Sequence, residues 1–298
     1  MSSSPTILIT GCRGQLGMDL MAHLSDSYQV AGISRAEVSV TDRTGLIRMF
    51  TAVRPDLVIH TAAMTDVDEC ELNPGMAMAI NADGTENVAL ACKAVNAKCL
   101  YFSTNYVFDG AKKAPYIEGD PVNPGTAYGR SKYAGEERIV SIIDDYIIVR
   151  IGWVYGSYGH NFVKTIIRHG TDQLRTRQDG KIARTLQVVA DQVGNPTWSM
   201  DIARQTDAII QSGLYGLFHV ASKGETSWFD FTRLIFEKLQ MPVSLESCSS
   251  AEFAQAATRP AYSALGNSRI AEAGIDVMRD YQHAIGDFLQ MHRESLCQ

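Results

Sequence analysis

A tyrosine and a lysine four positions apart, Tyr128 and Lys132, are the pair whose types and spacing most directly suggest catalysis. If this segment is helical, both side chains lie on one face. A phenol has an ordinary pKa of about 10, but a neighbouring lysine cation favours the phenolate and lowers that pKa toward the working pH. The same spacing is common on surface helices. The pair therefore predicts proton transfer only where other segments bring a substrate to it.

A hydroxyl-rich segment follows the apolar run 98–102. Ser103, Thr104 and Asn105 come directly after this run. If 98–103 is a strand of a parallel sheet, its carboxyl end lines the ligand crevice. A hydroxyl there can hydrogen-bond a substrate carbonyl and polarise it. The alternative for Thr104 is a helix cap or a turn residue.

A glycine-rich turn with the pattern Gly-x-x-Gly-x-x-Gly runs from Gly11 to Gly17. Gly11 can form the tight turn, Gly14 lets the backbone approach a pyrophosphate, and Gly17 allows close packing of a helix on a strand. Free N–H groups and the dipole at the start of that helix favour anions. Glycines also occur in ordinary strand–helix turns. This turn follows a first strand and precedes a first helix, which predicts a dinucleotide site.

The end of the next strand-like segment, 28–33, bears on the choice of dinucleotide. An acidic residue about 20 positions after the glycine turn would hydrogen-bond the ribose 2′-hydroxyl of NAD. The segment ends in Gly32-Ile33-Ser34-Arg35, without a carboxylate. Arg35 can pair with a 2′-phosphate and Ser34 can add a hydroxyl. We therefore predict NADPH as the preferred cofactor, with NADH possible. The alternative for Arg35 is a solvated surface side chain.

Strand-like and helix-like segments alternate through the first half of the chain. Short apolar strands between helices predict a parallel sheet covered on both faces, and right-handed crossovers make it doubly wound. The fold class is therefore α/β, a Rossmann-type doubly wound parallel sheet with a smaller C-terminal substrate-binding domain. The predicted strands are 6–10, 28–33, 57–60, 98–103 and 146–151, and the predicted helices are 18–24, 44–53, 76–95 and about 126–143.

The alternation loosens after about residue 152, where Gly, Pro and Asn turns interrupt it. We predict helices at 162–168, 200–211, 228–239 and 281–292. Residues 1–152 are assigned to a dinucleotide-binding Rossmann domain. Residues 153–298 are assigned mainly to the substrate domain, with some segments returning to the Rossmann sheet. We expect Trp198 and Trp228 to be structural.

Composition narrows the function classes. The chain has 298 residues and a net charge of −6, without a basic run, which argues against nucleic-acid and anionic-membrane partners. No apolar run approaches 18 residues, and the N-terminus lacks the pattern of a signal peptide. The six cysteines form no Cys-x-x-Cys pair, so we expect reduced thiols in a cytoplasmic protein. We predict no metal site.

Together these motifs resemble the extended short-chain dehydrogenase/reductase superfamily, and more specifically the dTDP-4-dehydrorhamnose reductase family, over about residues 6–290. Several long motifs in the same order make the resemblance more specific than any one of them. The strings that carry it are 54–68 (RPDLVIHTAAMTDVD), 80–87 (INADGTEN), 103–110 (STNYVFDG), 153–155 (WVY), 161–165 (NFVKT), 191–197 (DQVGNPT) and 259–260 (RP).

The resemblance implies NAD(P)H-dependent reduction of the 4-keto group of a nucleotide-linked 6-deoxy sugar, for polysaccharide biosynthesis. Tyr128 would donate the proton, Lys132 would hold the nicotinamide ribose and tune Tyr128, and Thr104 would orient the carbonyl. The resemblance adds cofactor-binding residues to those of the glycine turn and of the end of segment 28–33. The full predicted set is Gly11, Arg13, Gly14, Gln15, Leu16, Gly17, Ser34, Arg35, Ser39, Val40, Ala62, Ala63 and Thr65. The substrate-binding set that the resemblance implies is Asn105, Val107, Trp153, Asn161, Gln192 and Arg259.

The chain departs from the family pattern at three positions. Asn105 replaces an Asp, which turns a carboxylate acceptor into an amide and affects the expected choice of sugar. Ser39 replaces an Asp expected near the adenine. Thr258 replaces the first Arg of an Arg-Arg-Pro string. Arg259 remains, so there is one fewer cation for the substrate diphosphate.

Two other functions fit the same scaffold. One is an NAD-dependent sugar-nucleotide epimerase or dehydratase, against which the missing carboxylate at the end of 28–33 counts. The other is a non-catalytic regulatory subunit resembling the methionine adenosyltransferase partner, against which the intact Thr104, Tyr128 and Lys132 count. The oligomeric state is left open, with a homodimer as one option.

Overall fold

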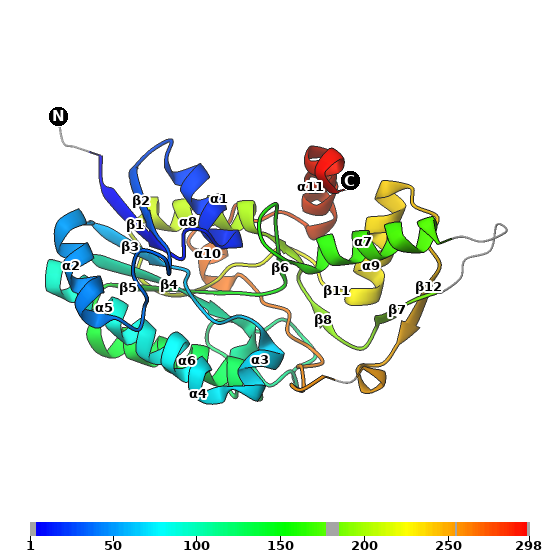
Figure 1. Cartoon of the computed structure of the whole chain (residues 1–298), viewed down its shortest axis with the longest axis horizontal. Coiled ribbons are helices and arrows are strands. Elements are labelled where there is room, and N and C mark those ends of the chain that lie inside the picture. The colour runs from blue at the N-terminus through cyan, green and yellow to red at the C-terminus, as the bar shows by residue number, and fades with distance from the viewer. Residues whose placement is uncertain (1–3, 177–184, 254, 297–298) are drawn as a thin grey trace.

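A parallel six-stranded sheet forms the centre of the computed structural model, which describes residues 4–176, 185–253 and 255–296 (Figure 1). The strand order β10-β5-β4-β3-β1-β2 confirms the predicted α/β fold with a doubly wound sheet. Its strands are β1 (Thr6–Thr10), β2 (Gln29–Ile33), β3 (Leu57–His60), β4 (Lys98–Thr104), β5 (Tyr146–Ile151) and β10 (Gly216–His219).

Helices cover both faces of the sheet because alternate strand residues point to opposite sides. Ile7 and Ile9 of β1 belong to one core cluster, which includes residues of α1 (Gln15–Leu24) and α8 (Ser199–Ser212). Leu8 points to the other face, into a cluster with residues of the three helices seen there in Figure 1. These helices are α2 (Arg43–Val53), α5 (Gly84–Val95) and α6 (Ala127–Ile142).

The helix predicted over 76–95 is divided by a π-helical turn. It consists of α4 (Pro74–Met78), the turn η1 (Ala79–Asp83) and α5. Asn81 in the turn is fully buried. Its side chain exchanges hydrogen bonds with the backbone of Met64 and donates to Ser131 Oγ at 2.9 Å. The irregular turn thus joins the loop after β3 to α6, and π-turns of this kind are frequent at functional sites.

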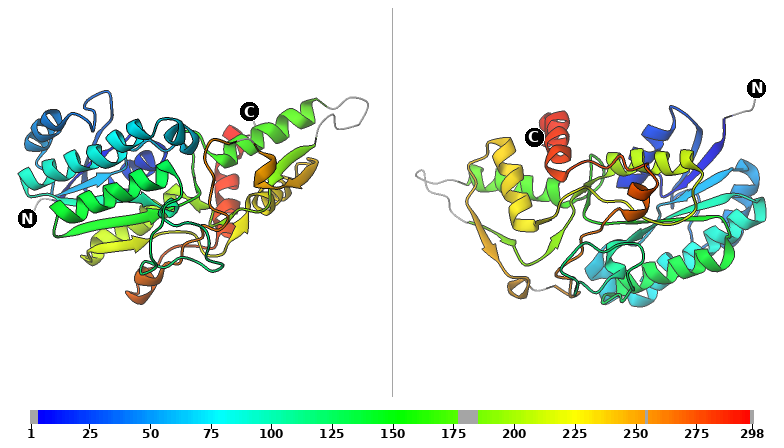
Figure 2. Two further views of the ribbon diagram at one scale, coloured as in Figure 1. Left: turned by 90° about the horizontal axis from the view of Figure 1, so that it is seen from below. Right: turned by 180° about the vertical axis from the view of Figure 1, so that it is seen from behind.

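A second, smaller layer lies to one side of the sheet (Figures 1 and 2). Strand β7 (Leu186–Val189) pairs in parallel with β12 (Leu245–Cys248), and three helices pack around a separate core cluster. These helices are α7 (Phe162–Arg175), α9 (Trp228–Leu239) and α11 (Tyr281–Leu296). Shorter elements complete the chain: α3 (Val67–Leu72), η2 (Asn105–Val107), β6 (Val154–Tyr155), β8 (Val193–Gly194), β9 (Thr197–Trp198), β11 (Thr226–Ser227), η3 (Ser250–Glu252) and α10 (Ser268–Glu272).

The strand order indicates where the ligand crevice lies. Strand β2 pairs with one side of β1 and β3 pairs with the other, so the connections after β1 and β3 leave in opposite directions. In open α/β sheets, ligands bind at such a switch point, at the carboxyl ends of the strands. No helix in the described part of the chain is long and apolar enough to cross a membrane.

A fully buried histidine links the sheet to the helical layer beneath it. His60 Nδ1 lies 2.7 Å from Thr10 Oγ1, and its Nε2 lies 3.1 Å from Thr85 Oγ1. The Thr85 hydroxyl already donates to Asn81 O at 2.7 Å, so it must accept from His60. His60 is therefore the neutral tautomer with its proton on Nε2. Burial lowers its pKa to about 3.

This buried histidine predicts a loss of stability in acid. The folded pKa of His60 lies below its ordinary value of 6.5, so only the unfolded chain takes up its proton between these pH values. The free energy of unfolding should be highest above pH 6.5 and fall toward pH 4.5, with His60 contributing on the order of 2 kcal/mol. Urea unfolding at several pH values measures this slope.

The control compares two histidines. His60→Asn should reduce the slope of stability against pH but not abolish it, because the buried His219, whose pKa burial also lowers to about 3, still titrates. His169→Asn removes an exposed histidine and should leave the slope as in the wild type. An unchanged slope in His60→Asn would contradict the assignment.

Candidate active site

The glycine-rich turn brings the end of β1 close to the end of β3. Gly11 has a φ of +73°, and a Cβ there would lie 2.7 Å from the backbone nitrogen of Ala62. A Cβ at Gly17 would collide with the carbonyl oxygen of Gly11. The first residues of α1 therefore sit directly over the strand ends with their N–H groups toward the crevice. Such a cradle suits a pyrophosphate.

Two cavities that share Gly14, Thr61 and Ala63 extend from this turn. The cavity of about 810 Å³, here called the adenosine cavity, lies beside the end of β2, and the cavity of about 440 Å³, here called the central cavity, lies beside β4 and α6. An elongated dinucleotide fits this path. Predicted cofactor residues in the adenosine cavity are Gly11, Arg13, Gly14, Ser34, Arg35, Ser39, Val40, Ala62 and Ala63. Those in the central cavity are Gly14, Gln15, Leu16, Gly17, Ala63 and Thr65.

The expectation that no carboxylate lies at the end of β2 is wrong. Glu37 folds back onto this strand end, where its Oε2 accepts from Ser34 N at 2.8 Å and from Ser34 Oγ at 2.5 Å. Its Oε1 forms an ion pair with Arg13 Nη2 at 2.8 Å. Glu37 lies twenty positions after Gly17, so its spacing was a usable signal.

Thr104, Tyr128 and Lys132 all line the central cavity. Thr126 caps α6 by accepting from Gly129 N at 3.0 Å, which begins the helix just before Tyr128. Lys132 is 3% exposed, and its Nζ donates to Phe102 O at 2.7 Å. Burial lowers the pKa of Lys132 to about 7, and the nearby carboxylate of Glu136 opposes this shift.

The expected lowering of the Tyr128 pKa by Lys132 is not what the structure shows. Burial raises the pKa of Tyr128 above its usual value, and the hydrogen bond with the Thr104 side chain offsets only part of the shift. The Lys132 ammonium is directed at the carbonyl of Phe102 instead. The phenol of Tyr128 therefore keeps its proton at neutral pH, as a proton donor must.

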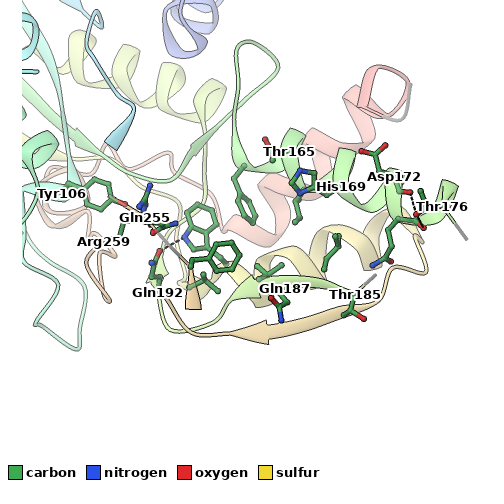
Figure 3. Close-up of a pocket in the computed structure, with 18 residues that line it drawn as sticks. Tyr106, Thr165, His169, Asp172, Thr176, Thr185, Gln187, Gln192, Gln255 and Arg259 are labelled. Atoms are coloured by element: carbon green, nitrogen blue, oxygen red, sulfur yellow. Dashed lines mark hydrogen bonds between the residues drawn. The ribbon is translucent and has the colours of Figure 1, made fainter. Parts of the chain in front are cut away.

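A third cavity of about 670 Å³, here called the outer cavity, lies between α7 and β7 (Figure 3). Thr165, His169 and Asp172 lie on α7 at one side of it, and Gln187 lies on β7 at the other. Tyr106, Gln192, Gln255 and Arg259 gather at the opposite end. Tyr106 and Trp228 line both this cavity and the central cavity. The outer and central cavities therefore adjoin at these two residues.

The predicted substrate residues in these cavities are held by neighbours. Arg259 pairs with Asp68 through an Nη2–Oδ2 contact of 2.8 Å. Gln192 accepts from Trp228 Nε1 at 3.2 Å and donates to Ser250 Oγ at 2.9 Å. The indole rings of Trp153 and Trp228 stack with centroids 3.5 Å apart. Trp228, expected to be structural, is thus part of the cavity wall.

Comparison with known proteins adds the family. Residues 5–294 match the RmlD substrate binding domain family. The chain belongs to this family. It is 36% identical to the spore coat polysaccharide biosynthesis protein SpsK of Bacillus subtilis (strain 168), over 98% of this chain and 99% of that protein. It is also 36% identical to a dTDP-4-keto-6-deoxy-D-glucose reductase of Streptomyces niveus, over 93% and 94% of the two chains.

Solved structures agree with this RmlD family membership. The chain is similar to a dTDP-4-dehydrorhamnose reductase from Bacillus anthracis str. Ames in complex with NADP, with a TM-score of 0.91 and 36% identity over 97% of this chain and 99% of that one. A dTDP-4-dehydrorhamnose reductase from Clostridium acetobutylicum gives the same TM-score, identity and coverage. The likeness therefore extends through both the sheet and the smaller layer.

Two residues of the predicted substrate set lie outside the three cavities of this RmlD family chain. Val107 is fully buried in a core cluster with Phe108 and Tyr116. Asn161 caps α7 and donates to Gln15 Oε1 at 2.7 Å, which ties α7 to the glycine turn. In the described ranges, no three His, Cys, Asp or Glu side chains come together as a metal site.

Asn105 lines the central cavity, but both ends of its amide are engaged within the protein. Its Nδ2 donates to Ser263 O at 3.0 Å, and its Oδ1 accepts from Thr104 Oγ1 at 3.3 Å. Ser263 Oγ accepts from Trp153 Nε1 at 3.1 Å. Asn105 thus links Thr104 to the wall of the cavity. An ionised carboxylate at this position could accept from Thr104 but could not donate to Ser263.

This arrangement predicts the effect of Asn105→Asp. An ionised carboxylate cannot donate, so one of its oxygens would face the Ser263 carbonyl without a hydrogen bond. The free energy of unfolding should fall by about 1–3 kcal/mol, as measured by urea denaturation. Ser25→Ala, which removes an exposed hydroxyl that donates to Met21 O, serves as the control. Equal stability of Asn105→Asp and the wild type would contradict the proposed link.

Proposed function

We propose that the chain is an NAD(P)H-dependent reductase of the 4-keto group of a nucleotide-linked 6-deoxy sugar, of the dTDP-4-dehydrorhamnose type. The observation that carries this proposal is the shared central cavity, which joins Thr104, Tyr128 and Lys132 to the glycine-rich turn. The names of the relatives support the same reaction class. A role in polysaccharide biosynthesis and a cytoplasmic location remain predictions.

The proposed chemistry divides between cofactor and protein. The bound nicotinamide would supply the hydride to the ketone carbon. Tyr128 would donate the proton of its phenol to the ketone oxygen, for which the raised pKa keeps it ready at neutral pH. The Thr104 hydroxyl, which donates to Asn105 Oδ1 at 3.3 Å in this structure, would turn its proton to that oxygen and orient it. In its protonated form, Lys132, with a pKa of about 7, would supply a positive charge that stabilises the phenolate left on Tyr128.

The ligands would occupy the three cavities in order. The dinucleotide would run from the adenosine cavity over Gly14 to the central cavity. The sugar nucleotide would enter from the outer cavity, where Phe162, Trp228 and Phe253 offer aromatic faces for a base or sugar. We accordingly keep the division into a cofactor part, 1–152, and a mainly substrate part, 153–298, as part of the proposal.

One argument against the epimerase or dehydratase alternative, the missing carboxylate, no longer holds, but the names of the relatives do not favour this alternative. Glu37 supplies the carboxylate whose absence had counted against NAD. The relatives at 36% identity are named as reductases or as a biosynthesis protein. The intact catalytic set likewise favours an enzyme over a regulatory subunit.

Tyr128→Phe tests the proposal directly. The variant retains the ring and removes only the proton donor, so turnover should fall by about 10²- to 10⁴-fold while the cofactor still binds. The assay follows NADPH or NADH absorbance with dTDP-, GDP-, UDP- and CDP-linked 4-keto-6-deoxy sugars.

Tyr133→Phe is the matched control, because it removes a hydroxyl from the same helix outside the central cavity. It should retain turnover within a few-fold of the wild type. If Tyr128→Phe did the same, Tyr128 would not be the proton donor. If no keto sugar were reduced by the wild type, the reductase proposal itself would fail.

A further inference from the structure

The helix that carries Tyr128 is held at its start by a carboxylate from another element. The first N–H groups of a helix have no partner within the helix itself. In α6, the N-cap Thr126 accepts from one of them, and Glu71 Oε2 accepts from another, Ala127 N, at 2.8 Å. A carboxylate at this place also suits the helix dipole. Because Ala127 directly precedes Tyr128, Glu71 fixes the backbone from which the phenol extends.

Glu71 can hold this backbone because its own helix, α3, is anchored. The N-cap Asp66 accepts a backbone hydrogen bond from the first turn of α3 at 2.9 Å. Cys70, the residue before Glu71, is fully buried and belongs to a core cluster that contains Ala127 and packs against Tyr128. The helix α3 therefore contacts the start of α6 in two ways, through this cluster and through the carboxylate of Glu71.

The hydrogen bond of Glu71 matters more than its charge. The other carboxylate oxygen lies 3.5 Å from Arg130 Nη2, in an ion pair whose side chains are 30% and 51% exposed. Solvated ion pairs of this kind contribute little. The hydrogen bond, in contrast, serves the backbone N–H of the buried Ala127, and a buried N–H has to be paired. An uncharged acceptor of the same reach should therefore replace Glu71.

Lys132, one turn further along α6, is held by β4 instead. Its Nζ donates to Phe102 O at 2.7 Å, and its backbone carbonyl accepts from Tyr101 OH at 3.2 Å. Neither contact involves α3. Loss of the Glu71 hydrogen bond should thus displace the start of α6 with Tyr128 and leave Lys132 in place.

We propose that Glu71 is a positioning residue that holds Tyr128 at the place from which it donates its proton to the ketone oxygen. The inference rests on the proposed function, because it requires Tyr128 to be the proton donor. Glu71 is not among the described residues that line the three cavities, so it acts through the backbone of Ala127 and not on the ligands. A misplacement of about 1 Å can lower a rate roughly a hundredfold.

The test measures kcat, KM and cofactor binding in three variants of the full chain, with the keto sugar that the wild type reduces best. Glu71→Ala removes the acceptor, so kcat should fall roughly ten- to a hundredfold. KM and the dissociation constant of NADPH should stay within about twofold, because the lost interaction acts on the transition state. Glu71→Asp keeps the charge but is one carbon shorter, and should lose as much. Glu71→Gln keeps the reach of the acceptor and should restore kcat to within a few-fold of the wild type.

Glu69→Ala is the matched control on the same helix. The exposed carboxylate of Glu69 accepts from Asn73 Nδ2 at 2.7 Å, a contact between α3 and its own C-cap, so kcat should equal that of the wild type. Glu71→Asp carries the test should Glu71→Ala not fold.

Two results would overturn this inference alone, provided that Tyr128→Phe has lost turnover. One is a wild-type kcat in the folded Glu71→Ala or Glu71→Asp protein, even at a lowered melting temperature, because Glu71 would then be merely structural. The other is a failure of Glu71→Gln to restore kcat. If Tyr128→Phe itself kept turnover, the assigned proton donor would be wrong and the proposed mechanism would fail with it.

Discussion

The close approach of two backbones at Gly11 is the contact on which the rest of the site depends. Strands β1 and β3 are neighbours, and the chain leaves their ends in opposite directions. A side chain at Gly11 would meet Ala62, and one at Gly17 would meet the Gly11 carbonyl. Without these side chains, α1 begins directly over the strand ends. The crevice, the exposed N–H groups of α1 and the route from the adenosine cavity to the central cavity follow from this one contact.

A line of alternating buried charges supports the other side of the central cavity. Glu136, one helical turn after Lys132, is bound bidentately by Arg150 at 2.8 and 2.7 Å. An isolated buried ammonium would lose its proton, and a buried carboxylate without a partner would destabilise the fold. Glu136 offsets part of the burial effect on Lys132, while Arg150 compensates Glu136. The Lys132 pKa near neutrality is therefore a property of α6 and β5 together.

Local pattern was sufficient for much of the fold and for the centre of the site. Strands β3 and β5 and helix α9 have the predicted bounds, because apolar runs and turn residues delimit them. The sixth strand, Gly216–His219, was not predicted, because four residues show no periodicity and only β5 makes them a strand. Trp228 reaches the cavity through stacking on Trp153, a contact across 75 positions. Glu37 was visible in the sequence, but the turn that folds it onto Ser34 was not.

Two arginines that face ligand cavities are each paired with a protein carboxylate, Arg13 with Glu37 and Arg259 with Asp68. An anionic ligand that binds either arginine would therefore share or compete for its donors with a carboxylate, and would gain less than at an unpaired arginine. This suits a chain with a net charge of −6, which has no long-range field to attract phosphates. Under such exchange, the number and geometry of the donors decide which anion binds. At the proposed ligand sites, the paired carboxylates would thus favour selectivity at some expense of affinity.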